Sequence, residues 1–359
     1  MIISKFDKIK IAGMSAAVPV ERIPVESFNE AFGEENVQKF SEMTGVKSIH
    51  RSHSGQTAGD LGYEAARQVL EKSSTNPGEI GMLIFVTQKP DYRVPSTAFV
   101  LHKRLDLPKE CSAFYLNLAC SGFIYGMQLI LSMLQQSESK KALLITGDTS
   151  VRTLSPHDRA MIMVFGDSGS ATLFEKSDEA SPIWITSRTD GKRFKAIITP
   201  AGAYRNLNLP KERTAWGDGM VRSDYDTHMK GMDVFGFSIT DVPKLIKDFM
   251  EYLETTNDSY DYFALHQANM YILKQISRKI KIPPEKLLVS LDRFGNNSSN
   301  SVPLLLADHF GASDNQKIRT LMSGFGAGLS WACADVSIDV SNILPLIFTD
   351  SGFLEGRNV

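Results

Sequence analysis

The sequence predicts an α/β fold built from two related halves, and three observations support this prediction. Short apolar runs of β-forming residues alternate with helical stretches along the whole chain, which favours helix-covered, mostly parallel sheets. The chain has 359 residues, which is long for one ordinary domain and suits two. Two pairs of short segments, with one member of each pair in either half, also resemble each other.

The first pair consists of FYLNLACSGF (114–123) and YFALHQANM (262–270), each with the pattern of a strand, a candidate reactive residue and a helix. The second pair consists of VFGDSGSATLF (164–174) and GFGAGLSWACADV (324–336), in which a glycine-rich turn leads into a strand. A duplication of one ancestral unit would explain both pairs.

The predicted elements follow the same scheme, with a boundary between the halves near 175–195. We place the N-terminal half, which holds the candidate nucleophile, at 1–180 and the C-terminal half at 181–359. Apolar runs bounded by turn residues predict strands at 82–88, 113–119, 142–148, 171–174, 196–199, 262–266 and 287–291, with a final hairpin around 318–339. Periodic stretches predict helices at 56–72, 96–105, 121–137, 240–255, 268–281 and 301–311.

Two further segments need separate treatment. The N-terminal stretch Lys8–Val20 faintly resembles a signal peptide, because lysines precede the apolar run IAGMSAAVPV. Gly13 and Pro19 interrupt that short run, so we expect a first β-strand and a turn there. The segment 200–230 is rich in Gly, Arg, Asp and Asn, and we expect a long excursion that covers a site.

Composition excludes several function classes. Apolar residues make up 42% of the chain, charged residues 22%, and the net charge is −2, without the concentrated basic patch that nucleic-acid binding needs. No apolar run approaches the ~20 residues that span a bilayer. Three cysteines, with no CxxC pair, suggest neither a disulfide framework nor a zinc site. We therefore expect a reduced, cytoplasmic protein that binds no metal, nucleic acid or membrane.

Cys120 is the candidate nucleophile. It lies between an apolar strand and SGFIYGMQLILSML, which is apolar nearly all round and predicts a buried helix. The positive end of that helix's dipole would stabilise a thiolate. Gly122 and Gly126 would allow a backbone or substrate to come close. The alternative is that Cys120 is only a small buried apolar residue, as free cysteines commonly are.

Three more features could take part in chemistry. His266 lies at a predicted strand-to-helix junction, where it is either a catalytic donor or a hydrogen-bonded core residue. Asn296 belongs to the polar loop RFGNNSSNSVP, which otherwise reads as a turn and a helix cap. GFGAGL (324–329) lacks the nucleotide-binding spacing, so it is either a tight turn or a source of N–H groups for an oxyanion.

Taken together, the chain resembles β-ketoacyl-acyl carrier protein synthase III in seven segments that occur in the family's order. These segments are TGVKS (44–48), ACSGF (119–123), RTLSPHDRAMIMVFGDSGSA (152–171), MKGMDVFGFSI (229–239), HQAN (266–269), LDRFGNNSS (291–299) and GFGAGLSW (324–331). The resemblance implies a thiolase-like, five-layered αβαβα fold of two pseudo-duplicated halves, normally assembled as a homodimer. It also implies fatty-acid or polyketide synthesis without any cofactor.

The resemblance implies a mechanism as well. Cys120 would take the acyl group from an acyl thioester donor, on acyl carrier protein or coenzyme A. A malonyl thioester on acyl carrier protein would then lose carbon dioxide, and His266 and Asn296 would stabilise the enolate as hydrogen-bond donors. The N–H groups of Cys120 and Ala327 would form the oxyanion hole, each worth ~3 kcal/mol. Acyl-pocket positions correspond to Phe165, Met229 and Phe325, with Val94 lent to the neighbouring subunit.

The chain departs from the family pattern at its substrate-docking surface. Well-known members hold the adenine of coenzyme A between a tryptophan and an arginine; the arginine corresponds to Arg159, but the tryptophan position holds Lys39. Met43 and Tyr271 stand where arginines are usual, and Ala327 replaces a common glycine. We therefore expect a preference for donors on acyl carrier protein, which would dock on a basic helix face made of Lys274, Arg278 and Lys279.

Several alternatives remain open from the sequence. A papain-like protease also uses Cys, His and Asn in this order, and the separation of 146 residues between Cys120 and His266 fits. Its local CGxCW pattern and secretory disulfides are missing. A same-fold acyltransferase would form an ester or amide without decarboxylation. Hydroxymethylglutaryl-CoA synthase would need a catalytic glutamate, and a non-catalytic polyketide subunit would usually have lost Cys120.

Overall fold

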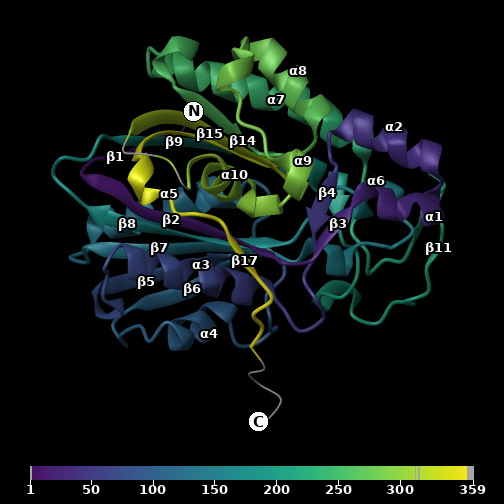
Figure 1. The fold of residues 1–359 in the computed structure, drawn as a ribbon, viewed down its shortest axis with the longest axis horizontal. Coiled ribbons are helices and arrows are strands. Elements are labelled where there is room, and N and C mark those ends of the chain that lie inside the picture. Colours follow the sequence, from purple (N-terminus) through teal and green to yellow (C-terminus); the bar gives the residue numbers. More distant parts are fainter. Residues whose placement is uncertain (1, 312, 314–315, 354–359) are drawn as a thin grey trace.

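The computed structural model describes residues 2–311, 313 and 316–353, and the strands within these residues form two large sheets (Figure 1). The first sheet has the order β17 (Ile347–Thr349), β2 (Ile9–Pro19), β8 (Ser168–Lys176), β7 (Lys141–Asp148), β5 (Ile80–Val86) and β6 (Ser112–Leu116). The second has the order β1 (Ile3–Phe6), β9 (Ile183–Thr189), β16 (Ser330–Asp339), β15 (Lys317–Gly326) and β14 (Tyr262–Leu265).

Helices separate and cover these sheets, so that five layers are stacked in Figure 1. The outer face of the first sheet is covered by α3 (Ala58–Lys72) and α4 (Thr97–Arg104). The middle layer consists of α5 (Gly122–Gln136) and α10 (Ser301–Phe310), each of which contacts both sheets. The outer layer on the second sheet consists of α7 (Gly231–Tyr252) and α8 (Met270–Ile280). This arrangement confirms the predicted five-layered αβαβα fold.

The composition of each helix explains its layer. α5 and α10 are apolar on nearly all sides, and a helix of that kind is stable only when surrounded by other elements. α8 instead buries one stripe, Ile272, Leu273, Ile276 and Ile280, against the core. Its remaining face is polar and faces solvent, as expected for an outer layer. None of the helices within the described residues is long and apolar enough to cross a bilayer.

The two sheets repeat one pattern of strand pairing. In the first, β2 pairs antiparallel with β8, β8 antiparallel with β7, and β7 parallel with β5. In the second, β9, β16, β15 and β14 pair in the same order with the same directions. Each sheet also takes a strand from the opposite end of the chain, since β1 pairs with β9 and β17 with β2. The domain boundary between residues 180 and 181 stays a prediction, and residues 354–359 lie outside the described part.

Several predicted elements differ from the structure. The expected strand at 287–291 is only a single bridge between Phe263 and Leu287, because α9 (Leu291–Phe294) follows at once. The expected strand at 196–199 is β10 (Ile197–Ile198), which pairs with β13 (His228–Met229) outside both large sheets. The expected helix at 240–255 begins at Gly231, although glycine disfavours helix, because Phe237 of its first turns is buried in the core.

Some short elements were not anticipated from the sequence. These include β1, β9, β17, α1 (Asn29–Phe32), α2 (Glu34–Thr44), α6 (Arg159–Ile162) and the paired strands β3 (Arg22–Pro24) and β4 (Ser48–His50). The excursion at 200–230 contains the small ribbon of β11 (Thr214–Ala215) and β12 (Val221–Arg222). Buried Asp158 holds this ribbon through an ion pair of 2.5 Å with Arg222. Met220, in the turn of the ribbon, reaches the cavity described below.

Candidate active site

Cys120 lies in the connection between β6 and α5, where the β15–β16 hairpin packs against it. A Cβ atom added to Gly326 would lie 2.9 Å from the Cβ and 3.1 Å from the Sγ of Cys120. A Cβ added to Gly324 would lie 2.8 Å from the Cys120 carbonyl oxygen. Because real Cβ atoms rarely come so close, these two glycines allow the hairpin to reach the cysteine. The close approach explains two of the glycines in GFGAGL.

His266 follows β14 directly and is held on three sides. Its backbone N–H donates to the Ser323 carbonyl of the neighbouring strand β15 over 2.8 Å. Its ring packs edge-on against Phe325, with the centroids 5.1 Å apart. Nδ1 lies 2.9 Å from the hydroxyl of Ser301 at the start of α10. These contacts fix the ring and leave its Nε2 side for the cavity.

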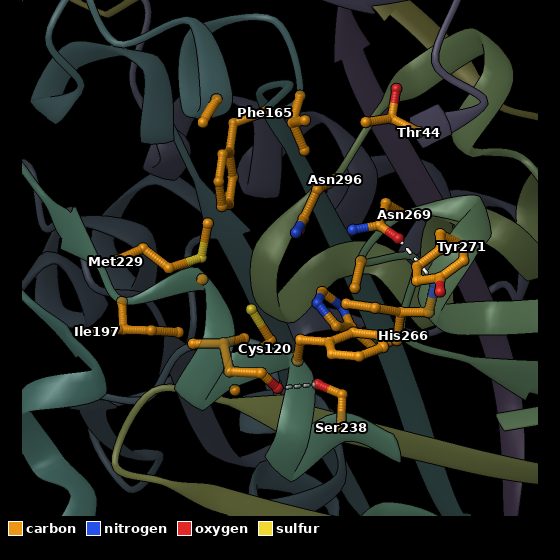
Figure 2. A pocket seen from close by; sticks show the side chains of 18 of the residues that line it. Thr44, Cys120, Phe165, Ile197, Met229, Ser238, His266, Asn269, Tyr271 and Asn296 are labelled. Carbon is orange, nitrogen blue, oxygen red and sulfur yellow. Dashed lines mark hydrogen bonds between the residues drawn. The ribbon is translucent and has the colours of Figure 1, made fainter. Parts of the chain in front are cut away.

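Asn296 is held by its backbone and by one end of its amide. Its N–H donates to the Val164 carbonyl over 2.8 Å, and its own carbonyl accepts from Gly166 N–H over 3.0 Å. Its Oδ1 accepts from the backbone N–H of Ser298 over 2.9 Å. The amide oxygen is therefore engaged, which leaves Nδ2 as a donor. Figure 2 shows this nitrogen end directed toward the centre of the cavity, near Cys120.

One cavity of about 400 Å³ brings Cys120, His266 and Asn296 together (Figure 2). Six more residues singled out in the sequence line the same cavity: Met43, Arg159, Phe165, Met229, Tyr271 and Phe325. A second, smaller cavity of about 50 Å³ lies beyond Cys120, and Ala327 lines that one. Cys120 borders both cavities, together with Phe165, Ile197 and Met229.

The remaining predicted residues lie outside these cavities. Val94 is 80% exposed and lines neither of them. Lys274, Arg278 and Lys279 are exposed together on the outer face of α8. Their assigned roles, in a neighbouring subunit's pocket and in carrier-protein docking, stay predictions.

Sequence comparisons assign the chain to a known family. Residues 106–191 match the family described as 3-oxoacyl-[acyl-carrier-protein (ACP)] synthase III, and residues 250–338 match its C-terminal domain. A β-ketoacyl-[acyl-carrier-protein] synthase III of Streptococcus suis is 32% identical, over 80% of this chain and 86% of the relative. The same enzyme of Thioalkalivibrio sulfidiphilus is 29% identical, over 90% of this chain and 98% of the relative. This chain belongs to the 3-oxoacyl-ACP synthase III family.

Solved structures agree with this assignment. The crystal structure of a 3-oxoacyl-(acyl-carrier protein) synthase from Burkholderia xenovorans has a TM-score of 0.90 and 32% identity, covering 97% of this chain and 99% of that one. As a member of the synthase III family, the chain is an acyl-transferring condensing enzyme. The predicted family and enzyme class are thereby confirmed.

Burial sets the charge state of the two titratable groups in this synthase site. Burial, together with the nearby Asp148 carboxylate, raises the pKa of the Cys120 thiol to about 12. Burial also lowers the pKa of the His266 imidazole to about 3. Near neutral pH the site therefore holds a protonated thiol beside a neutral imidazole. This contradicts the expectation of a thiolate, because burial and the Asp148 carboxylate both oppose the charged form of the thiol.

Sequence reasoning missed the polar groups that support the synthase site. Ser301, which contacts His266, was read only as part of a helix start. Asp148 at the end of β7 is buried and accepts hydrogen bonds from Thr87 Oγ1 over 3.1 Å and from Gln88 N–H over 2.8 Å. A buried carboxylate that ends a strand at the sheet edge was the signal that could have indicated it.

The outer mouth of the cavity differs from the expected coenzyme A clamp. Lys39 does not line it, and the Lys39 ammonium instead forms a 2.5 Å ion pair with Glu35. The next residue, Phe40, lines the cavity instead. Phe235 and Tyr271 stack at the mouth with centroids 5.5 Å apart. Among the described lining residues, Arg159 alone carries a fixed charge.

Proposed function

We propose that this enzyme transfers an acyl group to Cys120 and then condenses it with malonyl-acyl carrier protein, with loss of carbon dioxide, to give a β-ketoacyl product. One observation carries the proposal: the Cys120 thiol, the His266 ring and the free Nδ2 of Asn296 meet in one cavity. A nucleophile and two neutral hydrogen-bond donors are what acyl transfer followed by enolate formation requires.

In the first half-reaction, Cys120 attacks the carbonyl carbon of the acyl thioester. As the new C–S bond forms, the thiol proton passes to Nε2 of His266. Within the described residues, the N–H groups of Cys120 and Ala327 donate to no backbone carbonyl, so both can hold the oxyanion. When the intermediate collapses, the C–S bond to the donor breaks. The leaving thiolate takes the proton back from the imidazolium.

In the second half-reaction, the bond between the malonyl α-carbon and its carboxylate breaks and carbon dioxide leaves. The electron pair passes to the thioester oxygen as an enolate, which Asn296 Nδ2 and His266 Nε2–H stabilise. The α-carbon then attacks the acyl carbonyl, a C–C bond forms and the bond to Cys120 breaks. Cys120 leaves as a thiolate and takes one proton from solvent water, and the β-ketoacyl product stays on the carrier.

The two half-reactions need opposite tautomers of His266, and Ser301 can serve both. Its hydroxyl lies 2.9 Å from Nδ1 and 3.1 Å from the Ser298 carbonyl oxygen. When Ser301 donates to Ser298, it accepts Nδ1–H and leaves Nε2 as a base. When it donates to Nδ1, Nε2 carries the proton and can donate to the enolate.

Partners follow from the same proposal. The exposed basic face of α8, made of Lys274, Arg278 and Lys279, suits an acidic carrier protein.

Val94, Phe99 and Tyr115 lie on or near the β6 edge of the first sheet and are 80%, 54% and 39% exposed. Apolar residues exposed beside an unpaired strand edge favour a homodimer through β6. Light scattering coupled to size exclusion tests the dimer, and a monomer at micromolar concentration would exclude it.

The proposed function is tested by separating the two half-reactions. Incubation with a panel of acyl-CoA and acyl-carrier-protein donors should add one acyl mass to Cys120 in intact-protein mass spectra. Addition of malonyl-acyl carrier protein should then remove that mass and release carbon dioxide in equal amount. Removal of the acyl group by an alcohol or amine, without carbon dioxide, would instead identify an acyltransferase that forms esters or amides.

A further inference from the structure

The small cavity beyond Cys120 has a mostly apolar lining that also includes a few polar residues. The apolar lining residues include Leu154, Met161 and Phe165. Lys89, Thr153 and Thr227 line the same cavity. The Thr153 hydroxyl donates to the Ser150 carbonyl over 3.2 Å, and the Thr227 hydroxyl lies 3.0 Å from that of Thr199. A saturated acyl chain would leave the Lys89 ammonium without a polar partner in the cavity, which opposes its binding. Lys89 therefore suits an acyl group with a polar end.

Lys89 is the charged residue of that lining. It lies just beyond β5, and its backbone N–H donates to Thr87 Oγ1 over 2.9 Å. Lys89 lines the small cavity together with Cys120, and it also lines an open groove of about 770 Å³. An acyl chain that extends from Cys120 into the small cavity would therefore point its far end toward Lys89.

Within the described residues, no carboxylate forms an ion pair with the Lys89 side chain. Asp148 is the acid that influences it electrostatically, but its oxygens accept hydrogen bonds from Thr87, Gln88 and Ser299 instead. Burial lowers the pKa of the Lys89 ammonium, and the attraction of Asp148 only partly opposes this effect. A second anion placed in the cavity would favour the ammonium form and gain a charge-assisted hydrogen bond.

We propose that Lys89 selects acyl groups that end in a carboxylate, so that the preferred donor is the thioester of a short dicarboxylic acid. The inference rests on the proposed function, since it names the substrate class of the same cysteine. A cavity of about 50 Å³ holds on the order of four water-sized groups. This volume suits an acyl group of about four carbons, as in a succinyl group.

Matched donors test this proposal directly. Succinyl and butyryl thioesters on the same carrier have chains of equal length and differ in a terminal carboxylate or methyl group. We expect succinyl to load Cys120 about tenfold faster or more at limiting donor, from intact-protein mass spectra over time. Lys89→Met should abolish that preference and raise butyryl loading. Lys8→Met, a change at an exposed lysine paired with Asp178, is the matched control and should leave the ratio unchanged.

Each outcome bears on the inference separately from the proposed function. Butyryl loading that equals or exceeds succinyl loading would overturn the inference, as would an unchanged ratio in Lys89→Met. A clear preference for 3-hydroxybutyryl over succinyl would also overturn it. The hydroxyl groups of the cavity, and not the Lys89 ammonium, would then determine which donor is preferred. Normal butyryl loading by Lys89→Met would show that the variant is folded with a working nucleophile. Failure of every donor to load Cys120 would count against the proposed function itself.

Discussion

The two halves share a strand arrangement but contribute different chemistry from equivalent positions. The helices α5 and α10 occupy the same place between the sheets, yet α5 begins just after Cys120 and α10 begins just after the asparagine loop. The strands β5 and β14 are likewise equivalent, yet β5 leads to Lys89 and β14 to His266. These segments therefore reach two adjoining cavities that share Cys120: Lys89 lines the small one, and His266 and Asn296 line the main one. In the proposed mechanism, the nucleophile and the small cavity come mainly from the first half, and the neutral donors come from the second.

This division of labour predicts that loss of Cys120 stops all chemistry, while loss of the Asn296 donor affects decarboxylation alone. Acylation needs the thiol of Cys120 and a base to receive its proton. Decarboxylation needs only donors that hold the enolate oxygen, and both of these come from the C-terminal half. The predictions below test that separation in order of decreasing effect.

The largest effect is expected for Cys120→Ala. The variant should form no acyl-enzyme with any donor, because the attacking atom is gone, and intact-protein mass spectrometry measures this directly. Its thermal unfolding should stay near that of the wild type, since one small side chain is removed. An acyl mass on the variant would move the nucleophile to Cys111 or Cys333, both of which are buried away from the main cavity.

Asn296→Ala should affect one half-reaction only. Loss of a donor to a developing oxyanion typically lowers a rate by about 10²–10³. We expect a fall of that size in carbon dioxide release from malonyl-acyl carrier protein, with acylation of Cys120 close to normal. Release of labelled carbon dioxide and mass spectra of the acyl-enzyme measure the two steps. An equal loss in both steps would mean that Asn296 only supports the loop, and the division between the halves would fail.

The sequence predicted the layers of the fold better than the correspondence between its halves. The echo between 164–174 and 324–336 was right, because each segment leads into one of the equivalent strands β8 and β16. The echo between 114–123 and 262–270 was wrong, because β14 corresponds to β5 and not to β6. A strand followed by a reactive residue and a helix recurs at many strand ends of an α/β sheet, so that pattern alone cannot identify equivalent strands.

The candidate site likewise contains residues that the sequence predicted and residues that it did not. Cys120, His266 and Asn296 lie on short motifs that a single sequence displays, and the structure brings them into one cavity. Ser301 contacts His266 from 35 positions along the chain, and Lys89 approaches Cys120 only through the packing of β5 beside β6. Contacts of this kind depend on register and burial, which local patterns do not encode. Burial also reversed the expected charge state of Cys120.

The neutral pairing of Cys120 and His266 predicts how the free enzyme reacts with an alkylating agent. Because the thiol pKa is about 12, the thiolate fraction should rise about tenfold for each pH unit from pH 7 to pH 9. Iodoacetamide labelling of Cys120, followed by peptide mass spectrometry, should rise by about the same factor. A labelling rate that no longer rises with pH above pH 7 would reveal a preformed pair of thiolate and imidazolium.

Ser301→Ala should have a smaller effect, of about tenfold, because it removes one hydrogen bond from an imidazole that packing still holds. If Ser301 serves both tautomers, acylation and decarboxylation should fall together. Ser301→Thr keeps the hydroxyl and should restore most of both rates. Loss of only one half-reaction would show that the serine stabilises a single tautomer, and failure of threonine to rescue would point to packing instead.

The smallest effect concerns the docking of the donor, where both halves contribute to the mouth of the cavity. Phe40 of α2 and the stacked pair of Phe235 and Tyr271 give an apolar rim with Arg159 as its charged group, which offers little to the several phosphates of coenzyme A. Exposed charges contribute under ~1 kcal/mol each, so reversing two of the three on α8 should slow loading from acyl carrier protein about three- to tenfold.

The variant Lys274→Glu/Lys279→Glu tests this with the same acyl group on either carrier. Loading from acyl carrier protein should fall and become less sensitive to salt, while loading from coenzyme A should hardly change. Reversal at Lys244, an exposed lysine of α7 that pairs with Asp248, is the matched control. Acyl carrier protein docks through its acidic surface. A loss of loading confined to that carrier would therefore show that the basic face of α8 is its docking site. Equal losses with both carriers would instead show that these lysines act on the phosphates that the two donors share, and the preference for carrier protein would then need another cause.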